Sequence, residues 1–300
     1  MPPSSHLRGI LLAFAGFTFW VFADTTIKIV GRSALPAYEV LAFMGLFVAV
    51  SVAVYAGLRG EIRRIRPTAP IPQVIRSLLD IVNNLCVVVA LRHITLPLFY
   101  ILVFMAPLVV TLLAAFFLRE LIGLRRILAV LGGFAGVIIA VNPFSSSRQG
   151  DWIGYAACMV CVACFSVNMV WSRVLIRTEA PESLTFFSGM VQAVLGFSAM
   201  LFHAAPVSAL LLLGLVAVGI FCAGGALCVF RALRLISPST VTQYHYTQLV
   251  TGSLVSWLLW RQPPTLSMVL GGILIAAAGL YIALPRNRTG SSGLRTKTRT

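Results

Sequence analysis

The stretch LRELIGLRRILAVLGGFAGVIIAVNP, residues 118–143, decides the fold, because a similar stretch returns near the end of the chain. That second stretch is WRQPPTLSMVLGGILIAAAGLYIALP, residues 260–285. Both begin with a short polar turn, continue as a glycine-containing apolar helix, and end at a proline. A weaker match at a constant offset joins Gly9, Trp20 and Lys28 to Gly154, Phe165 and Arg173. The pattern indicates an internal repeat, with chance similarity between hydrophobic helices as the alternative.

The composition places the chain in a membrane. Of its 300 residues, 59% are hydrophobic and 10% are charged, whereas a soluble domain carries about 25% charged residues. Lipid must therefore solvate much of the surface. Apolar runs of spanning length predict ten transmembrane helices, at 9–29, 36–57, 73–91, 96–118, 124–142, 151–173, 183–203, 207–230, 238–260 and 265–284.

The basic residues predict how the chain is oriented. With the N-terminus in the cytoplasm, most of the 23 lysines and arginines face inward, as the positive-inside rule expects. Arg76 is counted among these cytoplasmic charges. The net charge of +15 does not indicate nucleic-acid binding, because the basic residues lie between apolar runs and form no groove-sized patch. Charge supports the orientation more firmly than the number of spans.

Five helices in each half imply that the two halves run through the membrane in opposite directions, because five is odd. The predicted fold is an all-α membrane protein of ten helices, built as two inverted five-helix repeats at residues 1–145 and 146–286. Residues 287–300 are expected to form a basic, disordered cytoplasmic tail. Inverted repeats are a transporter architecture, since exchanging the conformations of the two copies converts an inward-open state to an outward-open one.

The chain resembles the drug/metabolite transporter superfamily, in particular proteins with two EamA domains. The motif comprises Arg119-Glu120, residues 122–126, Gly133, Gly136 and Pro143, with Ala106-Pro107 in the preceding helix. The second copy departs from the family pattern at Gln262, where a glutamate is usual. The resemblance implies ten helices, cytoplasmic termini and a central substrate cavity, and the amino-acid exporters of the family are the most similar.

Polar residues inside the expected spans are the candidate binding residues. Asp24 and Lys28 are one helical turn apart, so either they form a mutual ion pair or Asp24 faces the cavity and meets a substrate amine or a proton. Asp80, Asn83 and Asn84 share one helix face that lipid would not tolerate. They either line a cavity or form a hydrogen-bond network between helices.

The ninth expected span carries Tyr244, His245 and Gln248, and so many polar groups favour a cavity wall over helix packing. Aromatic residues at helical spacing provide an apolar wall or ordinary packing. The full set expected at the substrate site is Trp20, Asp24, Asp80, Asn83, Tyr100, Phe104, Asn168, Tyr244, His245 and Gln248.

No metal site, cofactor or catalytic residue is predicted. Cys158, Cys161 and Cys164 follow each other at intervals of three, but neither histidine nor acid joins them, which favours helix packing. The sequence offers no evident cluster of fixed charges that could clamp one ligand, so we expect weak and permissive binding.

These observations predict a secondary transporter of the bacterial inner membrane that exports small amphiphilic metabolites, amino acids in particular, by alternating access. The expected partners are a small-molecule substrate and the lipid bilayer, with no nucleic acid, and the chain is expected to act as a monomer. The alternatives are an importer or exchanger of a nucleoside-like or vitamin-like compound, and an intramembrane lipid-modifying enzyme.

Overall fold

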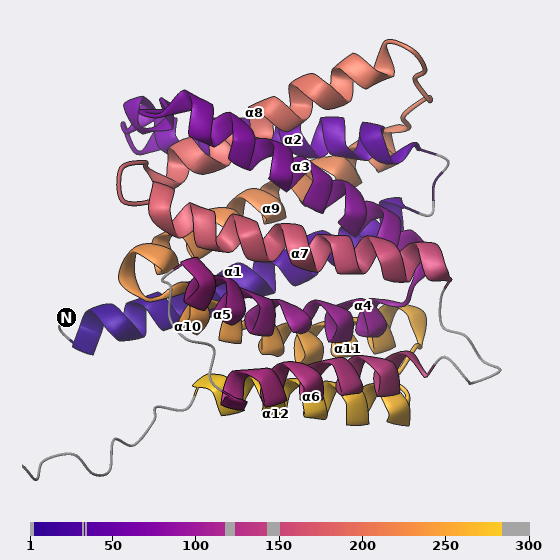
Figure 1. The fold of residues 1–300 in the computed structure, drawn as a ribbon. Helices are drawn as coiled ribbons and strands as arrows, with labels where there is room; N and C mark the ends of the chain where they lie inside the picture. The colour runs from indigo at the N-terminus through magenta and orange to yellow at the C-terminus, as the bar shows by residue number, and fades with distance from the viewer. Residues whose placement is uncertain (1–2, 32, 34, 118–123, 143–150, 284–300) are drawn as a thin grey trace, which may run out of the picture.

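The computed structural model describes residues 3–31, 33, 35–117, 124–142 and 151–283, which contain helices and no strand (Figure 1). The motif turn at 119–123 and the tail from residue 287 lie outside these residues. The helices are α1 (Pro3–Val30), α2 (Ala37–Leu58), η1 (Ile62–Ile65), α3 (Pro70–His93), α4 (Leu96–Val103), α5 (Met105–Phe117), α6 (Leu124–Val141), α7 (Trp152–Leu175), α8 (Pro181–Met200), α9 (Ala209–Leu235), α10 (Pro238–Gln243), α11 (His245–Trp260) and α12 (Leu266–Ala283).

Six helices in the described ranges are long and apolar enough to cross a bilayer: α1, α2, α3, α7, α8 and α9. Shorter apolar helical stretches occupy Leu96–Val110, Leu131–Val141 and Leu266–Ala278. Every segment expected to span contains a helix, but the fourth and the ninth are each broken into two helices.

The two breaks lie at similar positions in the two halves. The first is at Phe104, between α4 and α5, and the second is at Tyr244, between α10 and α11. Pro107 explains the first break, because proline has no N–H for the carbonyl of Val103 and its ring crowds that carbonyl. At the second break, both the N–H and the Oγ1 of Thr247 donate to the carbonyl of Tyr244, at 3.1 and 2.6 Å. This short local bonding replaces the regular helical pattern.

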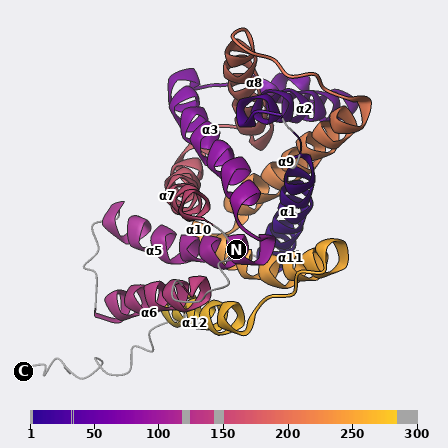
Figure 2. The same cartoon turned by 90° about the vertical axis from the view of Figure 1, so that its right-hand side faces the viewer.

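Helices of the two halves pack in reciprocal pairs. Helix α1 packs along α9, and its counterpart α7 packs along α3. Helices α2 and α8 pack together at one edge of the molecule, and α6 and α12 pack together at the opposite edge (Figures 1 and 2). This exchange of partners brings the halves together around a shared centre.

Glycine permits the closest of these approaches. A Cβ at Gly45 of α2 would lie 2.6 Å from the backbone nitrogen of Ala193 in α8, and one at Gly136 of α6 would lie 2.8 Å from the carbonyl of Gly271 in α12. Any larger side chain would force each pair apart. Close backbone approach at small residues is how helices associate in lipid, where no hydrophobic effect drives them together.

The outer surface is apolar, as a protein solvated by lipid requires. Large hydrophobic side chains point away from the centre, for example Phe14 at 45% exposure, Val54 at 54% and Leu258 at 57%. A water-soluble protein does not expose so many large apolar side chains on every face. The bilayer therefore takes the place of water around the helices.

Candidate functional site

A cavity of about 160 Å³ lies at the centre, where the halves meet. Helices of both halves line it, namely α1, α2, α3 and α4 from the first and α7, α8, α9 and α11 from the second. One wall carries amides and charged groups, and another carries aromatic rings. The cavity is therefore a mainly apolar pocket into which several polar and charged groups project, the arrangement expected of a small-molecule binding site.

The strongest polar network on its wall joins α3 to α7 and α8. Arg76 is only 1% exposed, and it donates from Nη1 to Asn168 Oδ1 at 3.1 Å and from Nη2 to the carbonyl of Leu184 at 2.9 Å. Asn168 in turn donates from Nδ2 to Asp80 Oδ1 at 3.1 Å, and the hydroxyl of Ser188 donates to Asp80 Oδ2. Asn168 thus bridges a guanidinium and a carboxylate, whose opposite charges compensate each other.

About two helical turns beyond Arg76 on α3, a second network consists of side-chain amides. Asn83 Nδ2 donates to Asn84 Oδ1 at 3.2 Å, and Asn84 Nδ2 donates to Gln192 Oε1 at 2.8 Å. Gln192 then donates to the carbonyl of Leu41 in α2 at 3.0 Å. The thiol of Cys161 donates to Asn83 Oδ1 at 3.3 Å. The α3 face that carries these amides therefore points to the interior, as predicted.

Elsewhere in the cavity lining, Asp24 of α1 is positioned by Tyr100 of α4, whose hydroxyl donates to Asp24 Oδ2 at 3.1 Å. Tyr100 is itself held by its close fit against Gly252 of α11, where a Cβ would lie 2.0 Å from Tyr100 Cε2. Lys28 lies one turn beyond Asp24, and its Nζ donates to the carbonyls of Leu91 and Ile94 at 2.9 and 2.7 Å.

Aromatic rings form the apolar wall. Trp20 and Phe165, which the sequence match pairs, meet edge to face with their centroids 6.1 Å apart. The ring of His245 packs between Phe165 and Phe17, at centroid distances of 4.6 and 4.2 Å, and is 2% exposed. Gln248 donates to the carbonyl of Phe17 at 3.1 Å.

The structure brings together most of the residues expected at the site. Those that line the cavity are Trp20, Asp24, Asp80, Asn83, Asn168, His245 and Gln248. Tyr100, Phe104 and Tyr244 do not line it. Tyr100 acts through Asp24, and Phe104 is buried against Tyr246 with centroids 5.0 Å apart. Tyr244 is half-buried at the break between α10 and α11, where it packs against the core.

Two expectations about charge are wrong. Arg76 does not belong to the loop charges on the cytoplasmic side, because it lies within α3 and is buried in the cavity wall. The expected absence of fixed charges also fails, since Arg76, Asp24 and Asp80 all line one cavity. A single arginine six residues into a helix has the same sequence pattern as an arginine that snorkels to the interface. Its burial depends on Asn168 and Leu184, which are distant in sequence.

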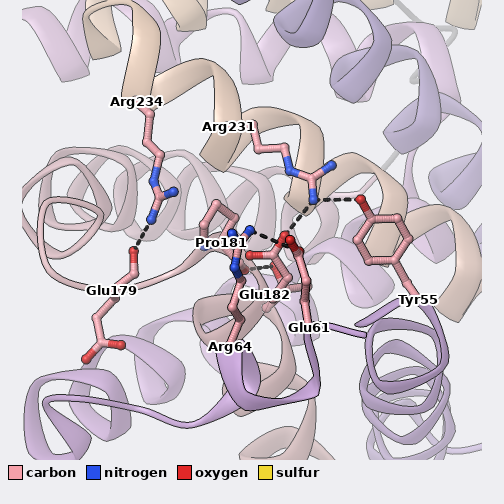
Figure 3. Close-up of polar contacts among 9 residues, drawn as sticks. Tyr55, Glu61, Arg64, Glu179, Pro181, Glu182, Arg231 and Arg234 are labelled. Carbon is pink, nitrogen blue, oxygen red and sulfur yellow. Dashed lines mark hydrogen bonds and ion pairs between the residues drawn. The ribbon is translucent and has the colours of Figure 1, made fainter. Parts of the chain in front are cut away.

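One helical turn beyond the cavity, an ionic contact ties three helices together (Figure 3). Arg231 of α9 donates from Nη2 to Glu182 Oε1 of α8 at 2.5 Å and to the hydroxyl of Tyr55 of α2 at 2.8 Å. The side chain of Glu182 is 2% exposed and that of Arg231 is 31% exposed. We call Tyr55, Glu182 and Arg231 the latch. The latch lies next to the cavity, because Thr185, one turn after Glu182, and Phe230, next to Arg231, both line the cavity.

A neighbouring acid strengthens the same end of the bundle. Glu179 Oε1 accepts hydrogen bonds from the N–H groups of Thr68 and Ala69, at 2.8 and 2.5 Å, just before α3 begins. Arg234 donates to the carbonyl of Glu179 at 2.8 Å (Figure 3). A carboxylate at a helix N-terminus satisfies free N–H groups and interacts favourably with the helix dipole.

At the other end of the bundle, contacts between α3 and α7 hold the helices together. His93 Nδ1 lies 2.7 Å from Asp151 Oδ2, and Asp151 Oδ1 accepts from the N–H of Gly154 at 3.0 Å, so Asp151 caps α7. The Gly154 hydrogen bond, with His93 as a smaller contribution, holds the pKa of the Asp151 carboxyl below its usual value.

The six helices of spanning length in the described ranges, the apolar outer surface and the central cavity with its buried polar groups define a multi-pass membrane transporter. The chain belongs to the EamA-like transporter family, whose model matches it twice, at residues 7–142 and 152–284. It is thus a member of the drug/metabolite transporter superfamily. The two matches confirm the family resemblance that the sequence motifs indicated, and together they cover nearly the whole chain.

Several relatives bear names that state a transported compound. An S-adenosylmethionine uptake transporter of Rickettsia bellii is 22% identical over 263 residues, covering 86% of this chain and 87% of the relative. A pseudopaline exporter of Pseudomonas aeruginosa is 27% identical over 285 residues, covering 94% and 97%. A riboflavin transporter of Rhizobium johnstonii is 28% identical over 185 residues, covering 60% and 59%. A solved crystal structure has a TM-score of 0.66 at 19% identity, covering 94% of this chain and 97% of its own, which supports the fold alone.

Proposed function

We propose that the chain is a secondary transporter that exports small amphiphilic metabolites of the amino-acid type across the bacterial inner membrane. In this proposal, the ten helical segments are ten spans, arranged as two inverted repeats at residues 1–145 and 146–286. The reciprocal packing of α1 on α9 and of α7 on α3 supports the repeat, as does the pair of broken helices at Phe104 and Tyr244. Both termini are expected in the cytoplasm.

The central cavity is the observation that carries this proposal. Its lining joins an aromatic wall at Trp20 and Phe165 to charged groups at Asp24, Arg76 and Asp80. An amphiphilic metabolite has the matching composition, an apolar part and a charged part. Because both halves contribute lining helices, a relative movement of the halves would change access to the ligand, as alternating access requires.

A relative movement of the two halves would have to break the contacts of the latch. The latch joins α2 of the first half to α8 and α9 of the second, and it lies at the arginine-rich end that the positive-inside rule assigns to the cytoplasm. In this proposal an intact latch closes the cavity on the cytoplasmic side. Opening toward the cytoplasm then requires that Arg231 separates from Glu182.

Growth of a bacterial host that lacks its own amino-acid exporters tests the function. The host expresses the full chain and grows on a panel of toxic amino-acid analogues. We expect resistance together with a lower internal analogue concentration. Ala226→Trp, which places a large ring in the cavity lining, should abolish the resistance. Val54→Trp adds the same ring on the outer surface, where Val54 is 54% exposed, and should leave it intact. Uniform sensitivity across the panel would refute the amino-acid assignment.

Uptake is the second candidate, favoured by the Rickettsia bellii relative named for S-adenosylmethionine uptake. Vesicles of the two orientations separate the directions. Accumulation of a labelled substrate in inside-out vesicles, driven by an imposed gradient, supports export. Accumulation in right-side-out vesicles alone would establish uptake and contradict the proposed direction.

A further inference from the structure

The charges that line the cavity are not balanced. Its acidic and basic residues are Asp24, Arg76, Asp80 and His245, and it also contains the thiols of Cys161 and Cys222. Arg76 and Asp80 share Asn168 as a bridge, so the positive charge of one offsets the negative charge of the other. His245 is packed between aromatic rings. The carboxylate of Asp24 is left as the uncompensated charge of the lining.

The contacts of Asp24 leave part of its carboxylate open to the cavity. In the described part of the chain it accepts one hydrogen bond, from the neutral hydroxyl of Tyr100. Lys28 is the nearest cation along α1, but its Nζ donates to two backbone carbonyls, and Lys28 is outside the cavity lining. Asp24 is partly exposed although it lies within a spanning helix.

A carboxylate inside a membrane protein is stabilised by a partner of opposite charge, because lipid and protein solvate it poorly. We propose that Asp24 binds the ammonium group of the substrate, and that the cavity therefore selects amines whether or not they carry a carboxylate. Charge-assisted hydrogen bonds from an ammonium would fill the acceptor positions that Tyr100 leaves open. The inference rests on the proposed function and assigns the chemical class that the site accepts.

The position of Trp20 supports this assignment. Trp20 and Asp24 are four residues apart on α1, so they project from one face of the helix, and both line the cavity. An ammonium at Asp24 places the rest of a small ligand against Trp20 and Phe165. Arg76, in another part of the lining, is 1% exposed, and its Nη atoms donate to Asn168 and Leu184. Its Nε has no hydrogen-bond partner in the part of the chain that the structure describes, but Asp80, linked to it through Asn168, offsets its charge. A ligand carboxylate therefore meets no uncompensated cation among the described lining residues, and it is tolerated but not required.

Binding of matched compounds to the purified full chain tests the inference without a transport measurement. The probes are phenethylamine, tryptamine and isopentylamine, each beside L-phenylalanine, L-tryptophan or L-leucine and beside the corresponding acid that lacks the amine. The readout is the ligand-induced shift in thermal unfolding, with affinities from calorimetry. We expect at least one amine and its amino acid to bind, and the acid without the amine to bind about tenfold more weakly or not at all.

Variants identify the group responsible. Asp24→Asn keeps the size of the side chain and removes the charge, and it should weaken amine binding about tenfold or more. Tyr100→Phe removes the positioning hydrogen bond and should weaken it less. Asp151→Asn makes the same chemical change outside the cavity and should leave binding unchanged. Binding of the acids as tight as that of the amines would overturn the inference, as would full amine binding by Asp24→Asn or no amine binding by the wild type.

The outcomes also separate this inference from the proposed function. Amine binding that depends on Asp24, without transport in vesicles, would refute the transporter and keep the site. Transport that does not depend on Asp24, or that accepts the acids equally, would refute the site and keep the transporter.

Discussion

Breaking the latch should favour the open state of the cavity at the end where the latch lies. Glu182→Gln removes the negative charge that faces Arg231 and leaves the shape of the side chain almost unchanged. Glu182 is 2% exposed and Arg231 is 31% exposed, so the pair lies between a surface ion pair and a fully buried one. Loss of this charge-assisted hydrogen bond should cost about 2 kcal/mol, which corresponds to about a 30-fold shift in the equilibrium between closed and open states.

The native thiol of Cys222 reports this shift, because it lines the cavity. In a variant in which the other cysteines are replaced, a membrane-impermeant maleimide is added to the side that carries the latch. While the open state is the minor one, the labelling rate is proportional to its population. Glu182→Gln should therefore raise the labelling rate about 30-fold over the parent variant.

The exposed pair of Glu61 and Arg64 supplies the control. Its side chains are 32% and 54% exposed and three residues apart, with Glu61 directly before η1, so Glu61→Gln should change the labelling rate by less than about threefold. A double-mutant cycle with Arg231→Gln isolates the coupling between Arg231 and Glu182. An unchanged rate for Glu182→Gln, or an equal rise for Glu61→Gln, would show that the latch does not control access.

Three further predictions concern stability, measured as the midpoint of thermal unfolding in detergent. Arg76→Gln leaves Asp80 without its compensating charge and should destabilise the chain by about 3 kcal/mol. Adding Asp80→Asn should recover part of that loss. Additive losses for the two substitutions would refute the charge pairing. Gly252→Ala displaces the Tyr100 ring, since the new Cβ would lie 2.0 Å from Cε2. It should lower the free energy of unfolding by about 1–3 kcal/mol. As a control, the new Cβ of Gly57→Ala meets no neighbouring atom, so this variant should not be destabilised. The lowered pKa of Asp151 means that its stabilisation is present above about pH 4 and is lost as the pH falls through the folded-state pKa. The difference between wild type and Asp151→Asn should therefore be smaller at about pH 3 than at about pH 7, and a constant difference would contradict the assignment.

The spanning helices were predictable because lipid imposes a simple rule on sequence. A segment that crosses a bilayer must be apolar over a fixed length, and its polar residues must face the interior. The second rule placed Asp80 and Asn83 correctly at the cavity, although the third segment is polar enough to be mistaken for a loop. It placed Asn168 and Gln248 there for the same reason.

Which of the aromatic residues at the break between α4 and α5 face the cavity was not predictable in the same way. All eight residues of α4 are buried, so no face of that helix is distinguished from the others by its composition. From sequence alone, Tyr100 and Phe104 are equally plausible as cavity-lining residues, and contacts with neighbouring helices determine where each points. For Tyr100 the deciding neighbour is Gly252, in the other half of the chain. Contacts between distant helices also determine the burial of Arg76.

The two helix seams related by the proposed repeat differ in chemistry, and this difference predicts where water enters. Between α3 and α8 the seam is hydrogen-bonded, through Asp80 with Ser188 and through Asn84 with Gln192. Beside the cavity, the equivalent seam between α2 and α9 is apolar, with Met44 against Cys222 and Phe47 against Gly219. Its hydrogen bond between Arg231 and Tyr55 lies farther along, in the latch. Opening the first seam exchanges protein hydrogen bonds for hydrogen bonds to water, which changes the free energy little. Opening the second seam exposes apolar surface, at a cost of about 25 cal/mol per Å².

We therefore expect the seam between α3 and α8 to admit water and ligand. Replacing Asn84 and Gln192 together by leucine should hold this seam closed, because two apolar side chains then favour contact over hydration. The double variant should unfold at a higher temperature and transport more slowly. Met44→Leu at the other seam conserves its apolar character and should alter neither property by much. A double variant with a raised unfolding temperature and an undiminished transport rate would show that the ligand path does not pass between α3 and α8.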